Sequence, residues 1–212
     1  MFDWCHRFVV VPLITVVLGI GSIISLGADS SVSKAVVNVE NSIVQIKPHL
    51  SSNPALTCTG FVIQPRQVIT ANHCASKSMT IDGVPVMLIK SDVKVDLALY
   101  SVPNTTKSVA TLATSITRFQ AAYGVGYAFG FNTPYITLNR VILVEYNPKE
   151  FNMAPGIFVE GKFINGMSGG PFVNSDGEVL GIVQRSYEGV GYGVSTKTIQ
   201  AFLNSTPEKT TE

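Results

Sequence analysis

Charged residues are scarce in this chain and are not gathered into clusters. Lys, Arg, Asp and Glu make up 14% of the 212 residues, and the formal net charge is +1. Because there is no Lys/Arg cluster and no basic stripe with interleaved aromatic residues, a nucleic-acid-binding surface is not expected. The sequence also lacks a Cys and His spacing that fits zinc and has no phosphate-binding loop, so we expect neither a metal nor a cofactor.

The most informative segment that is present is a glycine-rich turn at residues 166–171, which reads Gly-Met-Ser-Gly-Gly-Pro. A serine in such a turn, with free backbone N–H groups on either side, is how many hydrolases present a nucleophile beside an oxyanion hole. The turn fits the Gly-x-Ser-Gly-Gly-Pro motif of chymotrypsin-like proteases and also the Gly-x-Ser-x-Gly nucleophile elbow of α/β-hydrolases. Glycine turns that end in Pro also simply join strands in β-proteins, so the motif alone leaves three interpretations open.

The small number of histidines distinguishes between these interpretations. The chain has three histidines, which are His6, His49 and His73. None follows Ser168, and this excludes the α/β-hydrolase order, in which the acid and the histidine come after the serine. A subtilisin-like order is weakly supported, because the acids that precede His73 all lie near the apolar N-terminal segment: Asp3, Asp29 and Glu40. The order His, Asp, Ser remains, with His73, an Asp between positions 82 and 96, and Ser168.

The surroundings of His73 carry a family resemblance. Residues 68–74 read Val-Ile-Thr-Ala-Asn-His-Cys, a β-branched run that ends in a small-residue turn with histidine. The segment resembles the Thr-Ala-Ala-His-Cys motif of trypsin-like serine proteases, with Asn72 in place of the second Ala. Cys58 precedes it on the previous expected strand, and the resemblance implies a disulfide between Cys58 and Cys74. For His49 we favour the interpretation of a loop or core residue without a catalytic role.

Three aspartates compete for the acid position. Asp96 heads an apolar strand, Val-Asp-Leu-Ala-Leu-Tyr, which is similar to the Asp-Ile-Ala-Leu or Asp-Leu-Ala-Val stretch of the family. An acid there can lie buried beside the imidazole and fix its tautomer. Asp82, in Ile-Asp-Gly-Val, reads as part of a hairpin turn, and Asp92 reads as part of a solvated loop. We therefore favour Asp96.

The N-terminal 28 residues are expected to be a targeting segment. Residues 8–26 form an apolar run without charge that is long enough to span a bilayer and longer than a usual signal-peptide core. We favour a signal-anchor transmembrane helix over a cleaved signal peptide with a cut after Gly27. Either places the body of the protein outside the cytoplasm, secreted, periplasmic or membrane-anchored, and the pair Cys58 and Cys74 agrees with an oxidising compartment.

The remainder of the chain reads as an all-β protein. Frequent glycine and β-branched residues favour short strands joined by turns, with hairpin signals at Asp82-Gly83 and at residues 174–177. The pattern predicts strands over residues 36–47, 59–63, 67–70, 79–81, 84–90, 96–102, 121–127, 135–146, 157–160, 170–173, 179–185 and 191–194, and a helix over 196–203.

The resemblance covers about residues 35–203 and implies two antiparallel six-stranded β-barrels of the chymotrypsin-like type. The expected division is an N-terminal hydrophobic helix within residues 1–28, a first barrel over 33–110, a second barrel with a short C-terminal helix over 111–204, and a flexible tail over 205–212. The compact loops are most similar in style to bacterial HtrA-type or viral and phage members without a PDZ domain.

The same resemblance implies a serine endopeptidase that acts on proteins or peptides. His73, Asp96 and Ser168 are the expected triad, and the N–H groups of Gly166 and Ser168 are the expected oxyanion hole. Met167 stands where trypsin-like zymogens carry an Asp that pairs with a new N-terminal amine, so activation by N-terminal insertion is not expected. The competing interpretation is a membrane-tethered, protease-like binding protein with a latent or inactive site.

The substrate pocket is the part of the site that the sequence defines least. Lys162 lies six residues before Ser168, and in the pocket it would favour an acidic residue before the cut, although a solvated loop lysine is the favoured interpretation. The other expected wall is formed by Gln184, Arg185 and Ser186, and Gly191 is expected to leave space beside it.

Overall fold

The computed structural model describes residues 37–49, 53, 56–76, 78–147 and 153–206. The expected targeting segment, residues 1–28, and most of the expected tail lie outside this part of the chain. Among the described residues, no helix has the length and apolar character needed to cross a bilayer.

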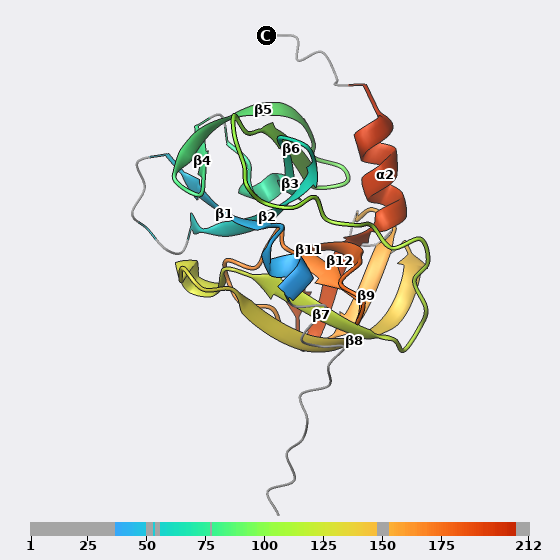
Figure 1. Ribbon diagram of the computed structural model, residues 1–212. Helices are drawn as coiled ribbons and strands as arrows, with labels where there is room; N and C mark the ends of the chain where they lie inside the picture. Colours follow the sequence, from blue (N-terminus) through green and yellow to red (C-terminus); the bar gives the residue numbers. More distant parts are fainter. Residues whose placement is uncertain (1–36, 50–52, 54–55, 77, 148–152, 207–212) are drawn as a thin grey trace, which may run out of the picture.

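The first half of the chain forms a closed barrel of six strands, paired in the order β1-β2-β3-β6-β5-β4. Every pairing is antiparallel. The barrel lies at the top of Figure 1. Its strands are β1 (Ile43–Pro48), β2 (Cys58–Gln64), β3 (Gln67–Ala71), β4 (Met79–Ile81), β5 (Val84–Asp92) and β6 (Leu97–Ser101). A 3₁₀ turn, η2 (Asn72–Cys74), follows β3 directly.

The second half forms another closed antiparallel barrel, in the order β10-β11-β12-β9-β8-β7, and helix α2 (Thr196–Asn204) follows it. Its strands are β7 (Ala121–Gly126), β8 (Tyr135–Tyr146), β9 (Gly156–Glu160), β10 (Pro171–Val173), β11 (Val179–Tyr187) and β12 (Val190–Ser195). The all-β prediction of two six-stranded antiparallel barrels with a short C-terminal helix is therefore confirmed. Figure 1 shows α2 beside the first barrel, although it leaves the second.

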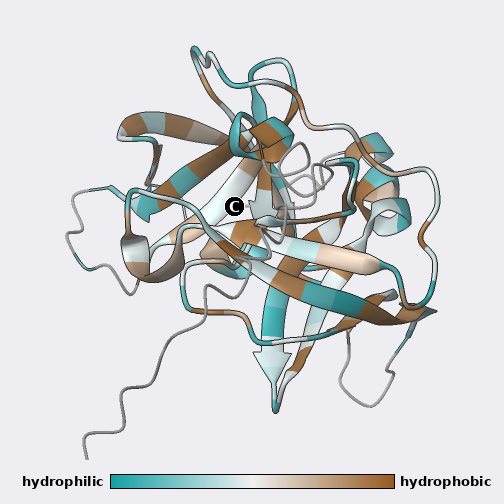
Figure 2. Cartoon of the chain, turned by 60° about the horizontal axis from the view of Figure 1, so that its bottom comes forward, coloured by the Kyte–Doolittle hydropathy of each residue, from teal (hydrophilic) through white to brown (hydrophobic). Residues whose placement is uncertain are grey.

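Alternation along the strands decides which side chains face which core. On β2, Val62 belongs to the apolar cluster of the first barrel, while its neighbours Phe61 and Ile63 belong to a cluster shared by both barrels. Successive side chains of a strand point to opposite faces, so one strand serves both cores. The shared cluster also takes Val125 from β7 and Ile182 from β11. Hydrophobic and hydrophilic residues alternate along several strands in Figure 2.

The predicted hairpin between β4 and β5 is confirmed. Asp82 and Gly83 have φ angles of 47° and 80°. Positive φ at both central residues is the signature of the type I′ turn, whose twist matches that of the flanking strands. The loop at residues 174–177 is also a tight connection, in which the Oδ1 atom of Asn174 accepts the N–H groups of Asp176 and Glu178.

Two local predictions were wrong. Residues 36–47 do not form one strand: residues 37–40 are helical and β1 begins only at Ile43. The reason is a local turn, in which both the N–H and the hydroxyl of Ser42 donate to the Val39 carbonyl at 2.8 Å. Asp96 does not begin a strand either, because it lies in the turn before β6 with a left-handed φ of 54°.

Candidate active site

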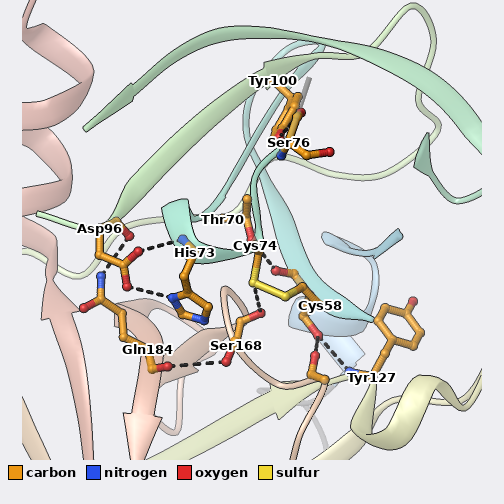
Figure 3. Close-up of a disulfide and its surroundings, with 12 residues drawn as sticks. Cys58, Thr70, His73, Cys74, Ser76, Asp96, Tyr100, Tyr127, Ser168 and Gln184 are labelled. Atoms are coloured by element: carbon orange, nitrogen blue, oxygen red, sulfur yellow. Dashed lines mark hydrogen bonds and ion pairs between the residues drawn. A yellow bond between two sulfur atoms is a disulfide. The ribbon is translucent and has the colours of Figure 1, made fainter. Parts of the chain in front are cut away.

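The seam between the barrels brings the three predicted triad residues together. His73 lies in η2, Asp96 in the turn before β6, and Ser168 in the loop between β9 and β10. Figure 3 shows the imidazole of His73 between Asp96 and Ser168. His73 and Ser168 also line one pocket of about 400 Å³.

Asp96 contacts His73 at two points. Its Oδ2 lies 2.8 Å from His73 Nδ1, and its Oδ1 accepts the backbone N–H of His73 at 2.8 Å. The side chain of Asp96 is 14% exposed and that of His73 is 42% exposed, so the carboxylate is covered while the imidazole reaches the pocket. When Nδ1 carries the proton that it donates to the carboxylate, Nε2 is free to act as a base.

The left-handed turn at Asp96 is held from both barrels. Its carbonyl accepts the N–H of Asn72 at 2.9 Å and the Nε2–H of Gln184 at 2.9 Å. The same Gln184 amide donates to the Val95 carbonyl at 3.0 Å. A non-glycine residue at positive φ persists only where its surroundings fix it. Gln184, which comes from β11, supplies part of that support.

Ser168 is held at the other side of the pocket. Its hydroxyl donates to the Gln184 carbonyl at 3.3 Å, and its own carbonyl accepts the N–H of Thr59 at 2.9 Å. Within the described residues, no hydrogen bond joins the Ser168 hydroxyl to His73.

The backbone around Ser168 carries the two predicted oxyanion donors. Gly166 has a φ of 100°, and a Cβ there would lie 2.2 Å from the Tyr127 carbonyl oxygen, so the position requires glycine. Met167 donates its N–H to the Ile164 carbonyl at 3.0 Å. In the part of the chain that the structure describes, the N–H groups of Gly166 and Ser168 have no acceptor, so both remain available to a bound oxygen.

A single buried threonine fixes this loop against the first barrel. Thr59 Oγ1 donates to the Gly166 carbonyl at 2.7 Å and accepts the N–H of Tyr127 at 2.8 Å. Its carbonyl in turn accepts the hydroxyl of Thr70 at 2.7 Å. Thr59 is fully buried, so these bonds are shielded from competing water.

The predicted disulfide between Cys58 and Cys74 is confirmed. It joins the start of β2 to η2, so it anchors the turn that carries His73. Both cysteines line the same pocket as His73 and Ser168. Figure 3 shows the bridge beside the serine.

The predicted substrate-pocket residues have different surroundings. Lys162, Arg185 and Ser186 are exposed, whereas Gln184 is buried and turns its amide toward Asp96. The space expected beside Gly191 is filled: a Cβ on Gly191 would lie 1.7 Å from the ring of Phe163.

Among the described residues, Asp96 is the only one of the three candidate aspartates that bonds to the imidazole of His73. Asp92 Oδ1 accepts the N–H of Lys94 at 2.7 Å, and His49 donates its backbone N–H to Ser78 at 2.9 Å. Asp82 Oδ1 accepts the N–H of Gln45 at 2.8 Å. Met167 is fully buried, beside Gly126.

Comparison with known proteins identifies the family of this chain. Residues 58–182 match the family described as trypsin-like peptidase domain, and this is more than half of the chain. The chain belongs to the trypsin-like peptidase domain family. It is thus a serine-type endopeptidase, a hydrolase. No curated protein matches the chain.

Solved structures show the same fold as this trypsin-like peptidase. The active form of the Rv3671c protease from M. tuberculosis is 22% identical with a TM-score of 0.69, and the match covers 84% of this chain and 88% of that one. The HtrA-type protease AlgW with a tripeptide is 19% identical with a TM-score of 0.72, covering 84% and 64%. The serine endoprotease from Yersinia pestis is 17% identical with a TM-score of 0.67, covering 81% and 64%.

Sequence reasoning missed three residues that shape the site of this trypsin-like peptidase. Thr59 and Phe163 were not identified, and Gln184 was expected to be only a pocket wall. A polar glutamine at the end of the apolar run 179–183 was a usable signal, because a buried amide needs partners. Thr59 and Phe163 gave no comparable signal, since Thr and Phe are ordinary residues beside β-strands.

Proposed function

We propose that this peptidase cleaves peptide bonds with His73, Asp96 and Ser168 through an acyl-enzyme intermediate. The observation that supports it best is the double contact of Asp96 with His73, at 2.8 Å for each oxygen. This contact sets the orientation of the imidazole and favours the tautomer with a proton on Nδ1. An imidazole in that tautomer presents Nε2 as a base toward the pocket that Ser168 also lines.

In the first half of the reaction, His73 Nε2 takes the proton of the Ser168 hydroxyl while Oγ attacks the carbonyl carbon of the substrate. The negative charge that forms on the carbonyl oxygen is stabilised by the N–H groups of Gly166 and Ser168. His73 then gives its proton to the departing amine as the C–N bond breaks, which leaves the acyl group on Ser168 as an ester. Asp96 stabilises the imidazolium that exists between these steps.

In the second half, water replaces the amine. His73 takes a proton from the water as its oxygen attacks the ester carbon, and the same two N–H groups stabilise the oxyanion again. The proton returns to Ser168 Oγ as the ester bond breaks, and the carboxylic acid product leaves. The enzyme is restored without a net change in its protonation.

We propose that the site works without insertion of a new N-terminus. Met167 has no charge to pair with an N-terminal amine, and it is already fully buried. The expected result is that a chain with an uncut segment before Val37 is active. Activity that appears only after a cut in residues 29–57, with the new amine buried beside Met167, would contradict this.

The competing hypothesis is a protease-like binding protein with a latent site. The observation that favours it is the hydrogen bond of the Ser168 hydroxyl to the Gln184 carbonyl, at 3.3 Å, in place of a bond to His73. A fluorophosphonate probe distinguishes the two, because it reacts only with an activated serine. We expect labelling of the wild type and none of Ser168→Ala. No serine-dependent labelling, with and without a peptide substrate mixture, would support the binding protein.

We further propose that the enzyme acts outside the cytoplasm on protein or peptide substrates, with residues 1–28 as a signal-anchor or a cleaved signal peptide. The disulfide between Cys58 and Cys74 supports this, since such bonds persist in oxidising compartments. Fractionation of the host, with a thiol-reactive mass label after denaturation, tests it. Recovery of reduced cysteines from a cytoplasmic fraction would contradict the location.

A further inference from the structure

The turn after β7 is strained and its side chains do not hold it. In η3 (Ala128–Gly130), Phe129 has a left-handed φ of 51°. Phe129 and Phe131 are 55% and 65% exposed, and their rings lie edge to face with centroids 6.4 Å apart. Because a non-glycine residue in this conformation needs support from its surroundings, other contacts must fix the turn.

This turn orients one peptide group of the serine loop. The N–H of Phe129 donates to the carbonyl of Asn165. The carbonyl of Asn165 and the N–H of Gly166 belong to one planar trans peptide, so they point in opposite directions. A carbonyl held toward Phe129 therefore turns the Gly166 N–H away from Phe129. If the peptide rotated by about half a turn, its carbonyl oxygen would point where the donor points now.

Gln45 is the residue of the first barrel that holds the turn. From β1, its Nε2 donates to the carbonyls of Gly130 at 3.2 Å and Phe131 at 3.1 Å. Gln45 is itself fixed by Asp82, whose Oδ1 accepts the Gln45 N–H at 2.8 Å and whose N–H donates to the Gln45 carbonyl at 2.9 Å.

We infer that Gln45 is a positioning residue for the oxyanion hole. By holding the carbonyls of Gly130 and Phe131, it keeps the Phe129 N–H on the Asn165 carbonyl and so keeps the Gly166 N–H directed into the hole. The inference rests on the proposed catalytic function, since it assigns Gln45 an effect on the stabilisation of the oxyanion. It does not involve contact between Gln45 and the substrate.

The test replaces the donor without changing the shape. Gln45→Glu has the same length but puts carboxylate oxygens against two carbonyls, whereas Gln45→Lys keeps N–H donors. We expect Gln45→Glu to lower kcat on a peptide substrate about 10- to 100-fold with KM nearly unchanged, less than the 10²–10³ of losing an oxyanion donor itself. Gln45→Lys should recover most of the rate. Gln64→Glu, at an exposed position of β2, is the matched control.

Two further measurements separate positioning from a general loss of structure. A peptide aldehyde adds to Ser168 and places its oxygen in the hole, so its affinity should fall as kcat/KM does. Fluorophosphonate labelling of Gln45→Glu should reach the same end point as in the wild type, because every site is still folded. Its rate should be lower, because the oxyanion hole is misaligned. A lower end point with a normal rate per labelled site would overturn the inference, and so would unchanged kcat in Gln45→Glu. A wild type that neither labels nor cleaves would instead refute the proposed function.

Discussion

Gln184 joins the two sides of the candidate site: its side chain donates to the Asp96 carbonyl at 2.9 Å, and its own carbonyl accepts the Ser168 hydroxyl at 3.3 Å. One residue of the second barrel therefore contacts both the acid turn of the first barrel and the proposed nucleophile. The arrangement couples the position of Asp96 to that of Ser168 across the seam.

Replacement of Gln184 by leucine should affect both stability and rate. Gln184→Leu removes the donor to the Val95 and Asp96 carbonyls in a buried setting, so we expect a loss of about 1–3 kcal/mol in the free energy of unfolding. The kcat should also fall, because the turn that holds Asp96 loses support. Denaturant unfolding and peptide hydrolysis measure the two effects, with exposed Gln64→Leu as the control. An unfolding free energy equal to that of the wild type would contradict the role of the amide.

Replacement of Asp96 by asparagine tests the tautomer argument. The backbone N–H of His73 keeps the amide oxygen at the place of Oδ1, so the NH2 group faces Nδ1 and can only donate to it. The imidazole proton then lies on Nε2 and the base is lost. We expect Asp96→Asn to lower kcat by about 10⁴-fold with little change in the folded structure. Asp92→Asn, at the end of β5, keeps an oxygen that accepts the Lys94 N–H and should leave kcat unchanged. Near-wild-type turnover of Asp96→Asn would show that another acid does this work.

Phe163 should limit the size of the substrate residue before the cut. Its ring lies over Gly191 and packs edge to face on Phe172, with ring centroids 5.0 Å apart. We expect the wild type to favour small residues at that position, and Phe163→Ala to shift cleavage toward larger apolar ones. A peptide library read by mass spectrometry measures the preference. An identical preference in both enzymes would remove Phe163 from the pocket.

The same library tests the acidic-pocket hypothesis for Lys162. That hypothesis requires Asp or Glu before the cut and the loss of this preference in Lys162→Ala. The exposure of Lys162 favours the alternative, in which the library shows no acidic preference and the variant cleaves as the wild type does.

Tyr192 should contribute to alkaline unfolding. Burial raises the pKa of its hydroxyl to about 12, whereas in the unfolded chain it is about 10. The folded state keeps a proton that the unfolded chain releases, so this contribution to stability is intact below pH about 10 and is lost as the pH rises toward 12. Tyr100 and Tyr127 have pKa values raised by burial as well, and they act in the same direction.

The variant Tyr192→Phe isolates this contribution. It should show a smaller fall of Tm between pH 9 and 12, roughly in the window set by those pKa values. At neutral pH the free energy of unfolding of Tyr192→Phe should be about 1 kcal/mol lower than that of the wild type. The variant lacks the hydroxyl that donates to the Ala154 carbonyl at 2.6 Å. Tyr187→Phe, at a residue that is 76% exposed, is the control. A fall of Tm as steep as in the wild type would contradict the assignment.

The sequence predicted the fold well because the signals for its strands and turns are local. Hairpin turns such as Asp82-Gly83 depend on residues that tolerate positive φ, and these are visible in the sequence. The candidates His73, Asp96 and Ser168 could be selected from their order along the chain, in which the acid follows the histidine and precedes the serine. The error at residues 37–40 arose because a turn made by Ser42 outweighed an alternating pattern.

Contacts between distant segments could not be predicted in the same way. The bonds of Thr59 to Gly166 and of Gln45 to Phe131 join residues 107 and 86 positions apart. Thr and Gln are both common on exposed strands, so the residue type does not predict such a distant partner. The space beside Gly191 was misjudged for the same reason, because glycine shows where room exists and not which side chain enters it.

The apolar cluster between the barrels has a consequence for how the enzyme can be assembled. Phe61 and Leu97 from one barrel and Val125 and Ile182 from the other are buried in the same cluster. A fragment that ended between β6 and β7 would expose half of this surface to water, and its counterpart would expose the other half. The two fragments should therefore associate when mixed, and recovery of peptide hydrolysis would then be a measure of the association of two separate polypeptides.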